Sequence, residues 1–136
     1  MTKTWWLPML LALSLVAASG CTRIAEMRHG IRIEGIRLTA SGYMLDLRYK
    51  VVDVERATAL LTEGKRPRLT DEATGATFAV PDMPKVGMLK TSARGHNLRE
   101  GMTGFVLFAN PAQFVKAGAK VTVAIGDLQV KHLVVQ

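Results

Sequence analysis

The stretch GIRIEGIRLTASGYMLDLRYKV, residues 30–51, decides the fold class because its apolar residues recur at every second position. Ile31 and Ile33 alternate with charged residues, and the alternation restarts after Gly35 with Ile36 and Leu38. A period of two is typical of a strand with one buried face. The change of phase at a glycine predicts a β-bulge or a bend at this point.

The second half of this stretch follows a Ser41-Gly42 turn and contains the clearest strand pattern in the chain. One face of the predicted strand is apolar and comprises Tyr43, Leu45, Leu47, Tyr49 and Val51. The other face carries Asp46, Arg48 and Lys50. This pattern predicts a strand with one buried and one exposed face.

The rest of the chain adds one short helix and further strands. Asp53 can cap a helical turn, with Ala57, Leu60 and Leu61 at helical spacing before Gly64. We expect strands at 66–71, 76–80, 86–92, 103–109, 121–125 and 128–135, with 93–101 as an exposed loop. The range 103–109 is apolar on both faces, which favours a central strand. The sequence therefore predicts an all-β domain over 30–136, an immunoglobulin-like antiparallel β-sandwich of seven or eight strands with one short helical turn.

The amino terminus has the pattern of a secretory signal. A positive leader, residues 1–4, precedes an uncharged apolar run from Trp5 to Ala18, and small residues follow. A spanning helix needs roughly 20 apolar residues, whereas this run is shorter and ends at a cleavable site. We therefore expect residues 1–20 to be a cleaved signal helix rather than a retained membrane anchor.

The residues Ala18, Ser19, Gly20 and Cys21 resemble the lipobox of bacterial lipoproteins. The resemblance implies that a dedicated peptidase recognises Ala18, Ser19 and Gly20 and cuts before Cys21, which carries diacylglycerol on its sulfur. It also implies a lipidated tether over 21–29, and Thr22 after the cysteine points to the outer membrane, where we expect the periplasmic face. The alternatives are an ordinary secretory leader that precedes a lone cysteine, or a buried Cys21 that acts as a small hydrophobe.

The charge and cysteine content narrow the classes of partner. The chain has 18 Lys and Arg against 11 Asp and Glu, and its basic residues are dispersed without interleaved aromatic residues. This pattern favours a solvated basic surface that meets anionic lipid, an envelope protein or a cell-wall polymer, and not nucleic acid. Because Cys21 is the single cysteine, an internal disulfide is excluded.

Motifs that carry catalysis or bind a cofactor are missing from the sequence, so we expect neither an enzyme nor a cofactor. Asp71 and Glu72 are adjacent on a predicted hairpin, where their side chains diverge, and His132 is in phase with the apolar residues of the last strand. One set of residues has metal-binding chemistry, because thioethers with an imidazole favour Cu(I). This set is Met83, Met88, His96 and Met102.

The mature part is similar to a group of small exported bacterial proteins that share short structural motifs. The motifs are a Tyr-x-Leu-x-x-x-Tyr-x-Val-x-Asp strand at 43–53, Thr74-Gly75, and Ile125-Gly126-Asp127. This resemblance implies export and a sandwich, and it implies no site. We expect a membrane-anchored envelope lipoprotein that acts as a non-enzymatic binding or structural module. The alternative is a periplasmic carrier of a small ligand or Cu(I) that uses Met83, Met88, His96 and Met102.

Overall fold

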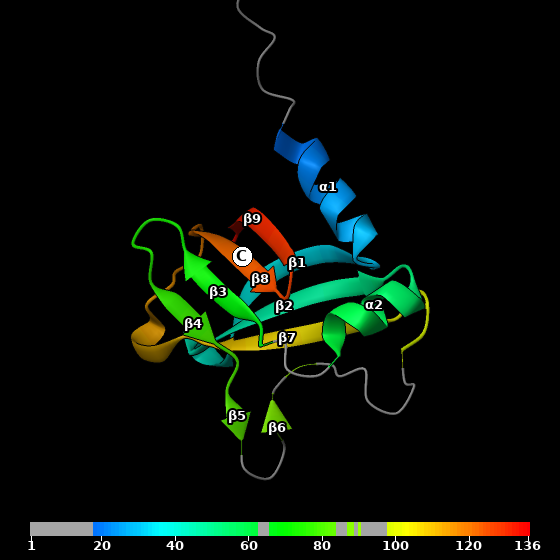
Figure 1. Ribbon diagram of the computed structural model, residues 1–136. Helices are drawn as coiled ribbons and strands as arrows, with labels where there is room; N and C mark the ends of the chain where they lie inside the picture. The colour runs from blue at the N-terminus through cyan, green and yellow to red at the C-terminus, as the bar shows by residue number, and fades with distance from the viewer. Residues whose placement is uncertain (1–17, 63–65, 84–86, 89, 91–97) are drawn as a thin grey trace, which may run out of the picture.

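The computed structural model describes residues 18–62, 66–83, 87–88, 90 and 98–136, and most of their regular structure is β (Figure 1). One sheet has the order β1 (Ile31–Thr39), β2 (Met44–Val51), β7 (Thr103–Ala109). The second sheet has the order β4 (Thr77–Ala79), β3 (Arg68–Asp71), β8 (Lys120–Ile125), β9 (Leu128–Val134). A two-residue pair, β5 (Asp82–Met83) and β6 (Gly87–Met88), forms a separate hairpin. All pairings within these sheets are antiparallel.

The helical segments are short. They are α1 (Ala18–Arg28), α2 (Val54–Leu61), and the 3₁₀ turns η1 (Ala40–Gly42) and η3 (Pro111–Gln113). The cap predicted for α2 is confirmed, because the Asp53 carboxylate accepts a hydrogen bond from the backbone N–H of Arg56 at 3.0 Å. Ala57, Leu60 and Leu61 face the core.

The β1–β2 pairing confirms the alternating pattern and the bulge. The register shifts between Ile33 and Gly35, which is where the sequence changes phase. Leu45, Leu47, Tyr49 and Val51 are all buried. Two expectations for this stretch are wrong: Tyr43 precedes the strand and is 56% exposed, and Asp46 is buried, because Arg37 and Arg48 both bind its carboxylate.

The two sheets share one apolar core and meet along an edge. Residues from the inward faces of both sheets belong to a single cluster, which includes Ile36 and Phe108 from one sheet and Val123 and Val130 from the other. Beyond β9, the N–H of Gln136 donates to the carbonyl of Ile36 at 3.0 Å, and the N–H of Leu38 donates to the carbonyl of Gln136 at 2.9 Å. The end of the chain therefore joins the second sheet to β1.

Two predicted strands differ from the sequence expectation. The central position expected for 103–109 is wrong, because β7 lies beside β2 and meets a single bridge at Lys90 on its other side in the described part of the chain. On its outward side, the Phe105 ring lies under the guanidinium of Arg48, whose carbon is 5.7 Å from the ring centroid. Of the range 86–92, the structure describes β6 and Lys90. The remainder of that range, and 93–97 of the expected loop, lie outside the described residues.

Candidate functional site

The predicted lipid site lies at the start of α1. This helix contains Ala18, Ser19, Gly20 and Cys21, whose side chains lie outside the part that the structure describes. Residues 21–29, which we expected to act as a tether, are helical as far as Arg28, and the end of the helix packs against β1 and β9. The segment between the predicted lipid site and the domain is therefore a docked helix, not a free linker.

Glu26 fixes α1 against the edge of β1. Its carboxylate accepts a hydrogen bond from the N–H of Ile33 at 3.4 Å, next to the bulge, so the helix covers a backbone donor at the sheet edge. Ala25 packs beside it against the core. Glu26 is 6% exposed, and this burial raises the pKa of its carboxyl. The Ile33 N–H and the positive charges of Arg23 and Arg32 oppose that rise.

Gly30 lies between the end of α1 and the beginning of β1, and its backbone contacts the start of α2. Its φ of +74° lies in the left-handed region, which favours glycine at the end of a helix. The carbonyl of Gly30 accepts hydrogen bonds from the N–H groups of Val52 and Asp53, at 2.9 and 3.1 Å. A Cβ at this position would lie 2.5 Å from the carbonyl oxygen of Asp53. The backbone of Gly30 therefore lies in direct contact with the start of α2.

A second feature is a cleft at the β3–β4 end of the domain. It has a volume of about 330 Å³. Its lining comprises Arg66, Pro67, Arg68, Thr77, Phe78, Ala79 and Val80. Arg66 and Arg68 are exposed, and no residue in the described ranges forms an ion pair with either. The cleft therefore offers two guanidinium groups, without an ion-pair partner in the described part of the chain, beside an apolar wall.

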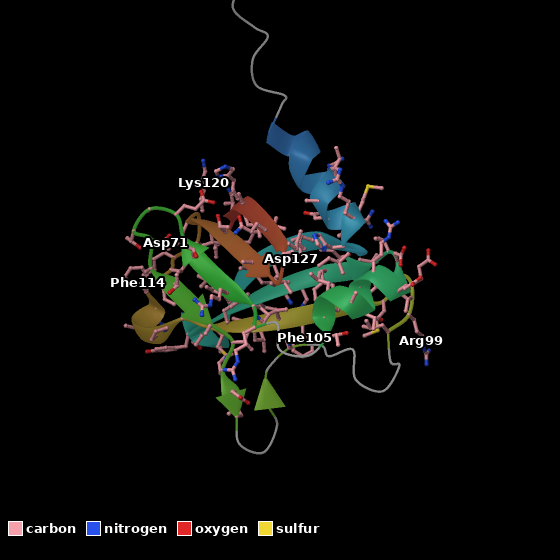
Figure 2. The ribbon with its side chains drawn as sticks, in the orientation of Figure 1. Asp71, Arg99, Phe105, Phe114, Lys120 and Asp127 are labelled. Carbon is pink, nitrogen blue, oxygen red and sulfur yellow. The ribbon has the colours of Figure 1, made fainter. Side chains whose placement is uncertain are left out.

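The cleft is bordered by aromatic residues and by the outer strand β4. The rings of Phe78 and Phe114 pack with centroids 5.6 Å apart, and Figure 2 shows Phe114 beside β4, far from Arg99. The N–H of Asp71 donates to the carbonyl of Ala76. Because hydrogen-bonded pairs alternate along an antiparallel ladder, Leu69 and Phe78 form the next such pair. The N–H and C=O groups of Thr77 and Ala79 therefore face away from β3.

Glu72 forms a surface cluster with β8 and β9. One carboxylate oxygen accepts from the backbone N–H of His132 at 2.7 Å and from the Thr122 hydroxyl at 2.8 Å, and the other lies 2.9 Å from Nδ1 of His132. Chiefly through the His132 N–H, these contacts lower the pKa of Glu72 to about 2. Asp71 instead accepts from Thr74. The expected divergence of the two carboxylates is confirmed.

The expectation that His132 continues the apolar phase of the last strand is wrong. The β8–β9 register shifts between Val121 and Val123, so two residues of β9, Lys131 and His132, lie opposite Thr122. His132 takes a φ of +59° and its side chain is 67% exposed. The bulge changes the phase of the strand, and Val135 is buried while Val134 is exposed.

Two of the predicted Cu(I) residues lie in one hairpin without being opposite each other, because Met83 pairs with Gly87 and Met88 pairs with Asp82. Met83 and Met88 lie on the paired strands β5 and β6, and Met83 is 46% exposed. Met102 packs against the core just before β7, whose start lies apart from β5 in Figure 1. His96 lies outside the described residues. Within the described ranges, no three His, Cys, Asp or Glu side chains are grouped so that they could hold a metal ion.

The described helices are also too short or too polar to cross a bilayer. No family model, curated protein or solved structure matches the chain. The class of the domain therefore follows from its own geometry, which is mostly β with two antiparallel sheets.

Sequence reasoning missed the cleft, although the pair Arg66 and Arg68 around Pro67 is a local signal that could have pointed to it.

Proposed function

We propose that this protein is an envelope lipoprotein in which Cys21 carries the lipid and residues 1–20 are a cleaved signal. The observation that carries the proposal is the Ala18-Ser19-Gly20-Cys21 sequence at the end of an uncharged apolar run. Its support from the fold is the helix that connects Cys21 to Gly30 and packs on the domain. The protein would be held at the periplasmic face of the outer membrane and act as a non-enzymatic binding module.

The strand order supports an immunoglobulin-like sandwich as the finer description of the fold. Such domains place the first, second and fifth strands in one sheet and the third, sixth and seventh in the other. Leaving aside the two-residue pair β5–β6, the order β1-β2-β7 and β3-β8-β9 follows this scheme if β4 is the strand added beside the third. Sandwiches of this kind commonly bind partners through loops and outer strands.

The β3–β4 cleft is the proposed binding surface, and its chemistry fits an extended acidic segment of an envelope protein. Arg66 and Arg68 can each bind a carboxylate through a charge-assisted hydrogen bond. The outward backbone groups of Thr77 and Ala79 can pair with an added strand. The side chain opposite Arg68 on β4 is Ala79, which leaves room for a segment beside the guanidinium.

Intact-mass analysis of detergent-extracted protein from producing cells tests the anchor. We expect a mass that begins at Cys21 and includes acyl chains, and loss of the lipid increment in Cys21→Ala. Thr22→Ser is the matched control and should keep the lipid. An unlipidated mass cleaved at another position would contradict the proposal, and so would an uncleaved leader.

Fluorescence anisotropy tests the cleft with a labelled peptide of alternating Glu and Val. The double variant Arg66→Glu with Arg68→Glu should weaken binding at least about tenfold, because two charge-assisted contacts become repulsive. The control double variant Lys116→Glu with Lys131→Glu makes the same change of net charge at exposed positions outside the cleft. Equal weakening by both would show attraction to net charge alone. Tighter binding of an anionic polysaccharide than of the peptide would assign the cleft to a cell-wall polymer instead.

A further inference from the structure

We propose that helix α1 lies on the surface of an anionic phospholipid bilayer, with Ile24 and Met27 in the interface and Arg23 and Arg28 on lipid phosphates. The inference rests on the proposed function, because it takes the lipid on Cys21 as the anchor. It adds an orientation: the domain would be held with α1 against the membrane and the β3–β4 cleft away from it.

The outward face of α1 carries two exposed apolar residues between two basic residues. Ile24 is 55% exposed and Met27 is 65% exposed, although both are large apolar residues. At 3.6 residues per turn, Arg23, Met27, Ile24 and Arg28 follow one another around the helix within about 140°. Two apolar side chains are thus flanked by two exposed arginines. Helices that lie in the membrane interface combine apolar residues with Lys or Arg in this way.

The inward face of α1 fixes this orientation. Ala25 packs against the core, and Glu26 is buried against β1. The N–H of His29 donates to the carbonyls of Ala25 and Glu26, and Gly30 closes the helix against α2. The helix therefore cannot rotate to bury Ile24 or Met27 on its own domain without losing these contacts.

The position of the anchor brings these side chains to the bilayer. At a rise of 1.5 Å per residue, Ile24 lies about 4.5 Å and Met27 about 9 Å along the helix axis from Cys21. Apolar faces of interfacial helices enter the head-group boundary by about 5–10 Å. A lipid on Cys21 would thus hold both residues beside the anchor point, from which their side chains can enter this boundary when the helix lies along the surface.

Charge favours a lipid surface over a second copy of the chain as the occupant of this face. Glu26 is the single acidic residue of α1, and it points to the domain. The outward face therefore carries positive charge alone, from Arg23 and Arg28. Two copies meeting at this face would bring like charges together, whereas anionic head groups attract each basic residue by about 1 kcal/mol.

An introduced tryptophan can report this contact. Trp5 and Trp6 are the two tryptophans of the chain, and both precede the predicted cleavage site, so a tryptophan added after it is unique in the mature protein. We would reconstitute the lipidated Met27→Trp variant in vesicles of phosphatidylethanolamine and phosphatidylglycerol that contain a brominated lipid. We expect the introduced indole to lose most of its emission. The control Phe114→Trp replaces a half-exposed aromatic residue beside β4 and should keep its emission.

A second pair of variants tests the apolar contact itself. Adding Ile24→Asp to the Met27→Trp protein should abolish the quenching, because a carboxylate replaces an apolar group at the interface. Adding Val54→Asp, at an exposed apolar position of α2, should leave the quenching unchanged.

Mass analysis of the same samples distinguishes the failure of the proposed orientation from the failure of the proposed lipid anchor. An intact lipid on a Met27→Trp protein that is as bright as the Phe114→Trp control would overturn the orientation and leave the anchor, whereas a missing lipid would overturn both.

Discussion

Gly30 and Asn110 each join segments of the chain that are distant in sequence, and they do so by opposite means. Gly30 lets the chain after α1 lie against the start of α2 because it has no side chain, and a Cβ there would lie 2.5 Å from the carbonyl oxygen of Asp53 and 2.7 Å from the nitrogen of Ala57. Asn110 is completely buried and uses its whole side chain. Its amide nitrogen donates to the carbonyls of Gly42 and Val115, and its oxygen accepts from the N–H of Val115.

The difference determines which substitutions are tolerated at each of these two joints, the residues that hold distant segments of the chain together. The contact at Gly30 is steric, so it fails when a group is added. The contact at Asn110 is polar, so it fails when a group is removed and buried backbone atoms lose their partners. The two joints also lie in different parts of the fold, because Gly30 precedes β1 whereas Asn110 follows β7 and holds the turn before β2.

The largest effect is expected for Gly30→Ala. The added methyl group meets backbone atoms, which cannot move without displacing α2, and alanine is strained at a φ of +74°. We expect the free energy of unfolding to fall by about 4 kcal/mol, from overpacking and backbone strain together. Urea denaturation followed by circular dichroism measures this loss.

The matched control is Gly75→Ala. Gly75 has nearly the same φ, +75°, but a Cβ there would meet no atom within 4 Å. This variant should lose about 1 kcal/mol from strain alone. If the two variants lost the same amount, the close approach of Gly30 to the start of α2 would not be the cause.

Asn110→Ala is expected to have the second largest effect. It leaves the N–H of Val115 and the carbonyls of Gly42 and Val115 without their side-chain partner in a buried corner. We expect a loss of about 3 kcal/mol in the free energy of unfolding. Gln113→Ala is the comparison, because it removes one bond from the same corner, to the carbonyl of Ser41, at an exposed site. A loss there as large as that at Asn110 would show that burial does not determine the cost.

The sequence predicted the strands well where one face of a strand is buried. Alternation over 31–39 and 44–51 gave the β1–β2 pair and its bulge, because period, turn residues and phase are all local properties. The corner at Asn110 could not be predicted. Its amide reaches Gly42, which is 68 positions earlier, and no local pattern identifies that contact.

The candidate sites also differ in whether they depend on a local sequence pattern or on contacts between distant residues. The lipid site could be proposed from the sequence because the Ala18-Ser19-Gly20-Cys21 motif is contiguous. The sequence marks one side of the cleft, through Arg66 and Arg68, but Ala79 on the other side joins them through the pairing of β3 with β4. The outward face of α1 was missed for a related reason. Its composition is visible in the sequence, but which side is outward depends on Glu26 binding the edge of β1.

A third joint, at Glu72, tests whether a polar contact at the surface behaves like the one at Asn110. Glu72 links the β3–β4 turn to β8 and β9 through Thr122 and His132. Because the pKa of Glu72 is lowered from 4.5 to about 2, the ionised form stabilises the fold above pH 4.5, and this contribution is lost as the pH falls toward 2. Glu72→Gln should therefore lower the free energy of unfolding at pH 6 by about 1 kcal/mol or less, because the contacts of this carboxylate are exposed to solvent.

The pH dependence of the free energy of unfolding distinguishes the contact at Glu72 from the two buried contacts at Gly30 and Asn110. The gap between Glu72→Gln and the unmodified protein should narrow between pH 4.5 and pH 2, since the unmodified carboxylate becomes neutral over that range. The losses at Gly30→Ala and Asn110→Ala involve no titrating group and should persist. Glu100→Gln, at an exposed turn residue, is the control for removal of a surface charge. A gap at Glu72 that stays constant down to pH 2 would mean that the side chain acts through its shape and not through its charge.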